Sequence, residues 1–253
     1  MKIVFSGLDQ SIVLGASWAT TLSIRNRALF ARICQSLLSG RGDRACEPYT
    51  LWSDQGEEIR PEGGFFSVVN PFELPWKHKA LVGQVQHRIN ELLIEDEETR
   101  RGLQELAEEI ASRIGALTFQ LHGSYEFGDE WGLVNYLKLF GFDACRLSNE
   151  PLLDNLMSFI DYVADARINK ALLFINLQTF LKENELEQLI ERLIFHGFET
   201  LFLENEREAE LYENEVGYTI DQRFLEYKKV CQSASPSPLQ GRICSNGFGA
   251  VTI

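Results

Sequence analysis

The chain has 253 residues, of which 45% are hydrophobic and 24% are charged, and its formal net charge is −13 at pH 7. This composition is typical of a globular protein and excludes a disordered chain, and the absence of any run of eighteen apolar residues excludes a membrane-spanning helix. An odd number of cysteines, without a C-x-x-C pair or an export signal, predicts a reducing cytoplasm; they are Cys34, Cys46, Cys145, Cys231 and Cys244.

The N-terminal part predicts strands around one helix. Residues 2–8 and 16–24 are rich in β-branched and aromatic side chains and are predicted to pair as two strands. Residues 26–40 have apolar side chains at helical spacing, with Asn26 as the N-cap and Gly40 as the stop. The sequence YTLWSDQGEEI (49–59) predicts a hairpin, and residues 64–76 predict a strand followed by a proline-containing loop.

The middle of the chain predicts two long helices. Residues 78–96 and 100–121 both have apolar stripes with a period near 3.6, and the acidic segment between them predicts a break. Two antiparallel helices joined by such a turn would form a projecting arm, which we assign to residues 77–128.

From residue 129 the pattern alternates between helices and strands. The predicted helices cover residues 129–141, 151–167 and 183–197, and the predicted strands cover 142–147, 170–177, 200–205 and 217–227. Such alternation predicts an α/β domain with a parallel sheet, here a discontinuous head domain of residues 1–76 and 129–230. The Ser-, Pro- and Gly-rich residues 231–253 are predicted to form a flexible tail.

This pattern is typical of P-loop nucleotide-binding domains, yet the sequence has no Walker A loop. Such a loop needs G-x-x-x-x-G-K-[ST], so that amides, a lysine and a hydroxyl hold the phosphates. The segment with Gly7 and Gly15 has no lysine, and the loop after residues 170–177 has no glycine. The sequence therefore predicts a P-loop-like sheet without ATP hydrolysis.

The charges are unevenly distributed. Residues 1–88 have ten Lys/Arg and eight Asp/Glu, a net charge of +2, and the remainder has fourteen and twenty-nine, a net charge of −15. Two explanations of this charge distribution remain open: chance unevenness on solvated surfaces, or a basic surface kept separate from an acidic one. Basic residues gather in and just after the helix at 26–40, and arginine clusters near helix termini bind phosphate well; they are Arg25, Arg27, Arg32, Arg41 and Arg44. Without a base-reading motif, DNA binding there would be independent of sequence.

Three carboxylates lie close together in the sequence near the end of the arm. Glu126, Asp129 and Glu130 lie within one short segment, and oxygen ligands of this kind suit Ca²⁺. The alternative is a helix N-terminus at Asp129 and Glu130, where the helix dipole favours acidic side chains. Two further hypotheses remain open: a metal-dependent DNA nuclease that uses Asp221, Glu226 and Lys228, or the carboxylates at 126–130, and a protein-interaction module that uses the arm and binds no DNA.

The sequence resembles a known family in three segments. KALLFINLQTFLKENELEQLIERLIFHGFETLFLEN (170–205), SIRNRALFARICQSL (23–37) and NPFELPWKHKAL (70–81) resemble the accessory adaptation protein of type II-A CRISPR systems, the Csn-two family. The order of the predicted elements also agrees, over about residues 1–227.

The resemblance implies a function. It implies a ring-shaped homotetramer, not an enzyme, that takes double-stranded DNA ends through a basic central hole and binds Ca²⁺. Its role would be spacer acquisition in antiviral defence, with the CRISPR integrase and the RNA-guided effector nuclease as partners. By position it makes Arg32 and Lys79 phosphate contacts, and it matches Asp129 and Glu130 to a calcium site. A further carboxylate expected four residues before Asp129 is Tyr125 here, with Glu126 one position away.

Overall fold

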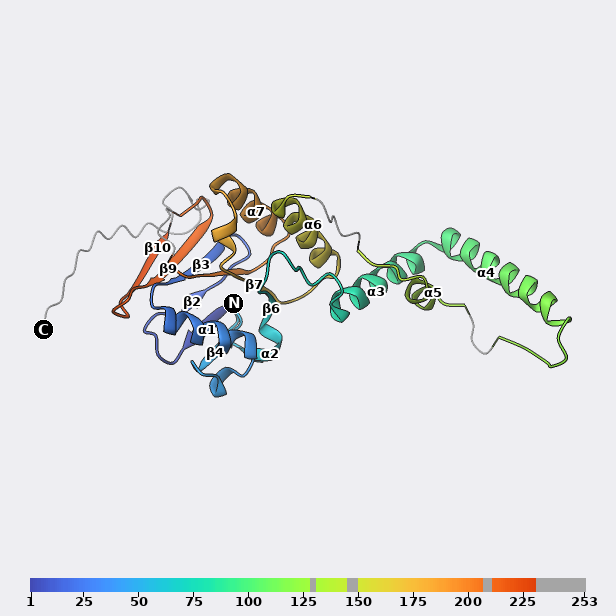
Figure 1. Cartoon of the computed structure of the whole chain (residues 1–253), viewed down its shortest axis with the longest axis horizontal. Coiled ribbons are helices and arrows are strands. Elements are labelled where there is room, and N and C mark those ends of the chain that lie inside the picture. Colours follow the sequence, from blue (N-terminus) through green and yellow to red (C-terminus); the bar gives the residue numbers. More distant parts are fainter. Residues whose placement is uncertain (128–130, 145–149, 207–210, 231–253) are drawn as a thin grey trace, which may run out of the picture.

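The computed structural model describes residues 1–127, 131–144, 150–206 and 211–230. These residues build a head with two β-sheets and a helical arm that extends from one side of it (Figure 1). The larger sheet has the strand order β10-β9-β3-β8-β7-β6. Its strands are β3 (Ala19–Ile24), β6 (Phe65–Val68), β7 (Ala171–Ile175), β8 (Thr200–Glu204), β9 (Glu215–Ile220) and β10 (Glu226–Val230). All but β10 run parallel, which confirms the predicted α/β class.

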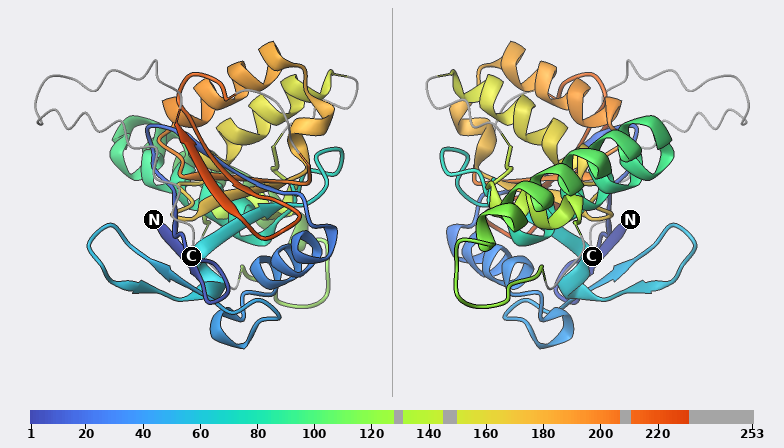
Figure 2. Two further views of the ribbon diagram at one scale, coloured as in Figure 1. Left: turned by 90° about the vertical axis from the view of Figure 1, so that its left-hand side faces the viewer. Right: turned by 90° about the vertical axis from the view of Figure 1, so that its right-hand side faces the viewer.

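The central strands of the larger sheet are apolar on both faces, because other elements cover the sheet on both sides. On one face, Leu172 and Phe174 of β7 pack with α6 (Leu152–Asp165) and α7 (Glu183–Phe195). On the other face, Leu173 packs with α1 (Arg27–Ser39) and the smaller sheet. Figure 2 shows the resulting layers, with α6 and α7 on one side of the sheet and α1 on the other.

The smaller sheet is antiparallel, in the order β2-β1-β4-β5. Its strands are β1 (Lys2–Phe5), β2 (Ile12–Val13), β4 (Tyr49–Trp52) and β5 (Glu58–Ile59). The hairpin predicted over 49–59 is confirmed as β4 and β5. The predicted pairing of residues 2–8 with 16–24 is wrong, because β1 and β3 belong to different sheets. The sequence of two neighbouring apolar strands does not determine whether they pair with each other or with more distant strands.

Helix α1 forms as its end signals predict. The Asn26 side chain accepts a hydrogen bond from the Leu29 amide at 3.0 Å, and Gly40 ends the helix in the left-handed region. Three short helical segments complete the head: η1 (Gly42–Arg44), α2 (Pro61–Gly64) and η2 (Leu177–Phe180). Residues 183–195 and 152–165 are helical as predicted.

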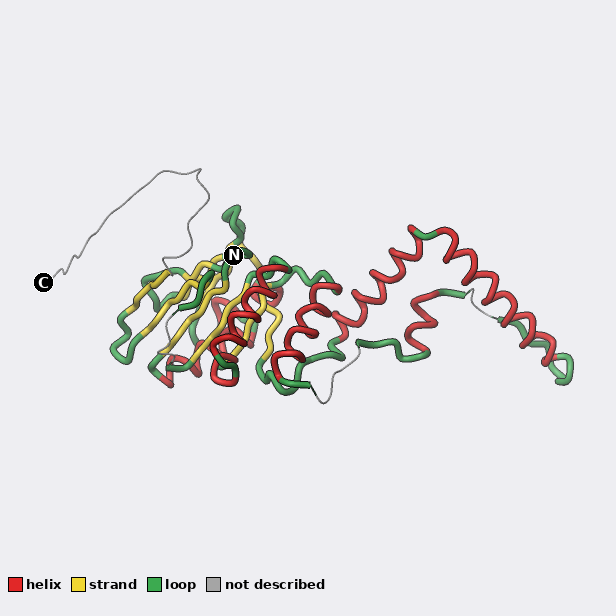
Figure 3. Tube along the Cα trace, turned by 90° about the horizontal axis from the view of Figure 1, so that it is seen from above, coloured by secondary structure: helices red, strands yellow, loops and turns green. Residues whose placement is uncertain are grey.

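The arm contains α3 (Lys79–Glu95), α4 (Glu97–Thr118) and α5 (Leu133–Leu139). The break between α3 and α4 is confirmed at Asp96, whose side chain accepts a hydrogen bond from the Thr99 amide at 3.0 Å and caps α4. The predicted antiparallel arrangement is wrong. Helix α4 continues outward from the end of α3 at a bend, and α5 lies beside α3 instead (Figure 3).

Two strand predictions also need correction. Residues 217–227 do not form one final strand but parts of two, because Asp221 begins a turn between β9 and β10. Of the strand predicted over 142–147, residues 142–144 lie in no strand, and residues 145–147 lie outside the described ranges.

Candidate nucleic-acid interface

The carboxyl ends of β9, β3, β8, β7 and β6 form one edge of the larger sheet, the edge at which α/β proteins bind ligands. At its centre, only Arg25 and Asn26 separate β3 from α1. Asn26 caps the helix, and neither residue is a glycine that would let the backbone wrap a phosphate. The sheet therefore has a P-loop-like strand and helix with no phosphate loop between them.

Two buried carboxylates lie at opposite ends of the strands: Glu204 ends β8 at this edge, and Glu215 begins β9 at the other edge. Glu204 and Glu215 are 2% and 1% exposed, and both are held by hydrogen bonds. Glu204 accepts from the Gln178 backbone amide at 3.1 Å. Glu215 accepts from the Thr21 hydroxyl and from the Tyr212 amide at 3.0 Å. These bonds fix the strand ends, since satisfied buried polar networks make a fold rigid. Sequence reasoning missed both residues, although an acid closing the apolar strand 200–204 was a signal.

A pocket of about 340 Å³ lies beside the edge, between β3, β9 and β10. Its lining includes Arg25 and Lys229 together with Tyr227 and the hydroxyl residues Ser23 and Thr219. Two cations with hydroxyl donors suit a phosphate group, but the Asp221 carboxylate also lines the pocket and opposes an anion there. Lys229 was missed by sequence reasoning, because the final strand was predicted to end before it.

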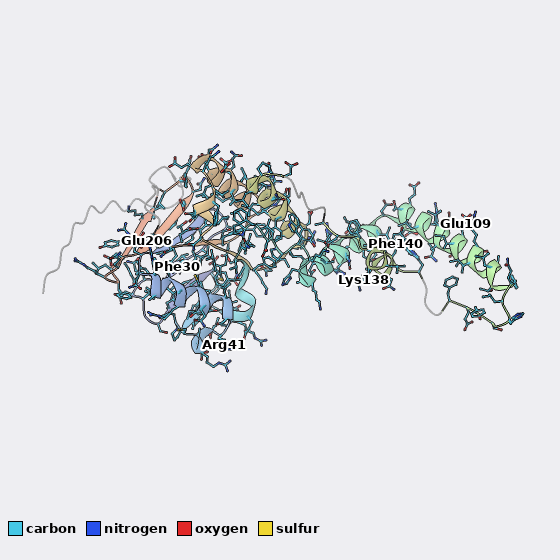
Figure 4. The ribbon with its side chains drawn as sticks, viewed as in Figure 1. Phe30, Arg41, Glu109, Lys138, Phe140 and Glu206 are labelled. Atoms are coloured by element: carbon cyan, nitrogen blue, oxygen red, sulfur yellow. The ribbon has the colours of Figure 1, made fainter. Side chains whose placement is uncertain are left out.

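The predicted basic residues fall into separate groups. Arg25 and Arg27 lie at the N-terminal end of α1, whereas Arg41 and Arg44 lie beyond its C-terminal end. A 13-residue helix is about 20 Å long, so one phosphate cannot contact both groups. Figure 4 shows Arg41 at the lower rim of the head, apart from Glu206, whose carboxylate lies 3.9 Å from the Arg27 side chain.

The other two predicted phosphate contacts differ from these groups. Arg32, midway along α1, donates to the Glu47 carboxylate, so an intramolecular ion pair already uses its charge. Lys79 begins α3 on the β6 side of the sheet, three strands away from β3, and its side chain is exposed. Arg44 is 83% exposed and lies 3.9 Å from the Asp43 carboxylate.

Of the predicted metal ligands, only Glu126 lies within the described ranges, where its side chain is exposed. Asp129 and Glu130 lie outside them. Among the residues that the structure describes, no three His, Cys, Asp or Glu side chains form a group that would hold a metal ion.

The residues of the nuclease hypothesis serve the fold. The two carboxylate oxygens of Glu226 accept hydrogen bonds from the Asp9 and Gln10 amides, each at 2.8 Å. Asp221 accepts from the amides of Arg223 and Leu225 in the turn before β10. Lys228 lies over the Tyr218 ring, with its Nζ atom 5.2 Å from the ring centre. This arrangement ties β10 to the N-terminal loop and leaves no carboxylate pair aimed at a shared ion in this hairpin.

Helix α4 has an apolar stripe that no described residue covers, since none of its residues is buried. The stripe follows helical spacing, and each of its four side chains is between 44% and 62% exposed; they are Leu106, Ile110, Ile114 and Leu117. We call this set the α4 stripe. Within the described part of the chain, no helix has both the length and the apolar character needed to cross a membrane.

Comparison with known proteins places the chain in a family. The model of the family described as CRISPR-associated protein (Cas_Csn2) matches residues 47–224, and no curated protein matches. A solved structure, the crystal structure of Stu0660 of Streptococcus thermophilus, is similar with a TM-score of 0.55. The likeness covers 87% of this chain and 74% of that chain at 13% identity, and at this identity it shows a shared fold alone. The resemblance drawn from the three sequence segments is confirmed, and the chain belongs to the CRISPR-associated Cas_Csn2 family.

Proposed function

We propose that the chain binds the ends of double-stranded DNA without reading sequence, as a ring-shaped homotetramer that supports spacer acquisition in CRISPR adaptation. It acts in the cytoplasm beside the CRISPR integrase and the RNA-guided effector nuclease, and it is not itself an enzyme. The observation that carries the proposal is the exposed basic residues at both ends of α1, on the head of a chain whose acidic surplus lies after residue 88. Only the local field matters to a bound duplex, so a net charge of −13 is compatible with DNA binding.

The two ends of α1 suit a duplex better than a small ligand. Groups about 20 Å apart match the spacing of several phosphates along one strand, each contacted separately. Arg41 and Arg44 are exposed beyond the C-terminal end, and Arg27 is exposed at the N-terminal end. Contacts of this kind position a protein on DNA and carry no sequence information.

The α4 stripe supports the homotetramer. Burying the leucine and isoleucine side chains on one face of this 22-residue helix would lower the free energy, because apolar surface is less favourable in water. A second copy of the arm offers a matching stripe, and symmetric contacts of this kind are the commonest in homo-oligomers. The stripe also favours the second candidate function, a protein-interaction module that binds no DNA.

We propose Ca²⁺ as the ion held by Glu126, Asp129 and Glu130. Three carboxylates supply the oxygen ligands that Ca²⁺ prefers, and the bound ion would offset their mutual repulsion. Chelation is expected to loosen the tetramer and to weaken DNA binding, without changing sequence preference. Sedimentation and gel shifts with and without EGTA measure both effects. Equal affinity and equal mass in chelator would contradict the calcium proposal while leaving DNA binding intact.

The test of the proposed function compares two forms of one DNA. Gel shifts at low salt with Ca²⁺ use a linear duplex and the same sequence as a closed circle. We expect a shift of the linear form alone, in tetramer-sized steps and without cleavage. Equal binding to both forms would replace the threaded ring with an open basic surface.

Two further outcomes identify the alternatives. No binding to either form at low salt would favour the protein-interaction module. Metal-dependent degradation of the linear DNA, abolished by Asp129→Ala, would establish the nuclease.

A further inference from the structure

A pocket of about 410 Å³ lies where the arm meets the head. Four parts of the chain line it: Trp76 before α3, Val82, Val85 and Gln86 of α3, residues 142–144 after α5, and one face of α6. Any ligand held here contacts the arm and the head at once. The volume lies in the range of small-molecule sites.

The pocket is acidic. Asp143, Asp161 and Asp165 line it, and no lysine or arginine is among the lining residues. The Asp161 charge is already used, because Arg192 Nε donates to its carboxylate at 2.7 Å. Asp143 accepts only from the adjacent Ala144 amide among described residues, and Asp165 forms no hydrogen bond or ion pair with any of them. Two carboxylates at the rim are therefore available to a cationic ligand.

An unpaired amide lies in the same pocket. Gln86 is 5% exposed and lines the cavity, yet its side chain makes no hydrogen bond to the residues that the structure describes. The amide atoms themselves reach the solvent of the pocket, so a ligand held there can meet them directly. The carbonyl oxygen of Gln86 is an acceptor for an N–H donor.

The walls of the pocket are aromatic. Trp76 and Tyr162 stack with ring centres 5.8 Å apart, and Phe142 lies at the rim, 48% exposed. Burial and the nearby Asp143 carboxylate raise the pKa of Tyr162 to about 12, so the phenol stays neutral at physiological pH. Aromatic faces attract organic cations and pack against their methylene groups.

We propose that this pocket binds a linear organic polycation, a polyamine of the spermidine type, and that the bound molecule fastens the arm to the head. Its ammonium groups pair with Asp143 and Asp165 and donate to Gln86, while its methylene chain lies along Trp76 and Tyr162. A metal ion fits less well, because no three acidic, histidine or cysteine side chains in the described part of the chain converge on one point. Carboxylates spread over a pocket match a cation whose charges are also spread.

The test is calorimetric titration of the full-length protein with spermidine at 150 mM NaCl. We expect one spermidine per chain. The double variant Asp143→Asn/Asp165→Asn should lower the association constant at least tenfold, and Gln86→Leu several-fold. Circular dichroism and thermal melting check that each variant folds. Because Asp143 and Asp165 are exposed, the double variant is less prone to unfold than the Gln86 variant.

A matched control removes two charges elsewhere, since a protein of net charge −13 attracts any polycation. Glu187→Gln/Glu191→Gln on the exposed face of α7 should bind spermidine within twofold of the wild type. Equal losses in both double variants, or several molecules bound per chain, would overturn the site in favour of non-specific attraction. Displacement by Ca²⁺ at matched ionic strength would mean a metal site instead, and absence of binding would mean that only water fills the pocket.

Discussion

The carboxylate of Asp161 links two helices of the head through charge. It lies on α6 and accepts from Arg192 of α7, and its second contact is His196 Nε2 at 2.8 Å. Burial by itself would raise the pKa of this carboxyl, but the bonds from Arg192 and His196 outweigh burial and hold the pKa below its usual value. A carboxyl whose pKa is lower in the folded state stabilises the fold above its unfolded pKa, and this contribution is lost as the pH falls through the folded pKa.

Asp161→Asn is therefore expected to destabilise the protein at neutral pH and much less in acid. The side chains of the pair are 37% and 35% exposed, and solvent screens such pairs, so we expect a loss of about 0.5–1 kcal/mol in the free energy of unfolding at pH 7. Urea unfolding of both proteins at pH 7, 5 and 3.5 measures the difference. A difference that stays constant down to pH 3.5 would contradict the role of the ionised carboxylate.

At the scale of elements, sequence predicts what local signals determine. Helix α1 was predicted within a residue at each end, because Asn26 and Gly40 mark its ends by their own chemistry. The sheet to which a strand belongs depends on distant partners, so β1 and β3 were wrongly paired. The apolar stripes of α3 and α4 predicted helices correctly, but the antiparallel pairing was inferred from the acidic turn between them, and such a turn does not require two helices to fold back on each other.

The α4 stripe gives a prediction about assembly. Ile110→Lys should leave the folded chain intact, because Ile110 is 58% exposed, and should shift the protein from the proposed tetramer to smaller species. Ser112→Lys places the same side chain on the opposite face of α4 and is the matched control, because Ser112 is exposed and lies two residues away. Analytical ultracentrifugation measures the mass, and circular dichroism checks the fold. Equal assembly of both variants would show that the stripe is not an interface.

At the scale of the whole molecule, the candidate site was only partly predictable. Sequence reasoning found Arg25 and Arg27 from their place at the start of the predicted helix, and the structure keeps them together at one end of α1. It could not find that Lys229 and Arg25 line one pocket, because only the order β10-β9-β3 in the sheet brings their strands together. Nor could it find that Arg32 is paired with Glu47, since that contact depends on how the chain after α1 folds back.

The affinity for DNA should depend on salt through the basic residues beyond the C-terminal end of α1. Each phosphate neutralised contributes about −0.9 to the slope of log affinity against log salt concentration, because a condensed counterion is released. Arg41→Ala/Arg44→Ala should therefore bind more weakly at low salt and show a slope smaller by about 0.9 for each contact removed. Arg101→Ala/Arg113→Ala removes the same charge from exposed positions on α4, where both arginines already face glutamates, and should keep the wild-type slope. Fluorescence anisotropy of a labelled duplex between 50 and 200 mM salt measures all three slopes. The opposite result would place the DNA along the arm rather than the head: Arg41→Ala/Arg44→Ala would keep the wild-type slope, and Arg101→Ala/Arg113→Ala would show a smaller slope.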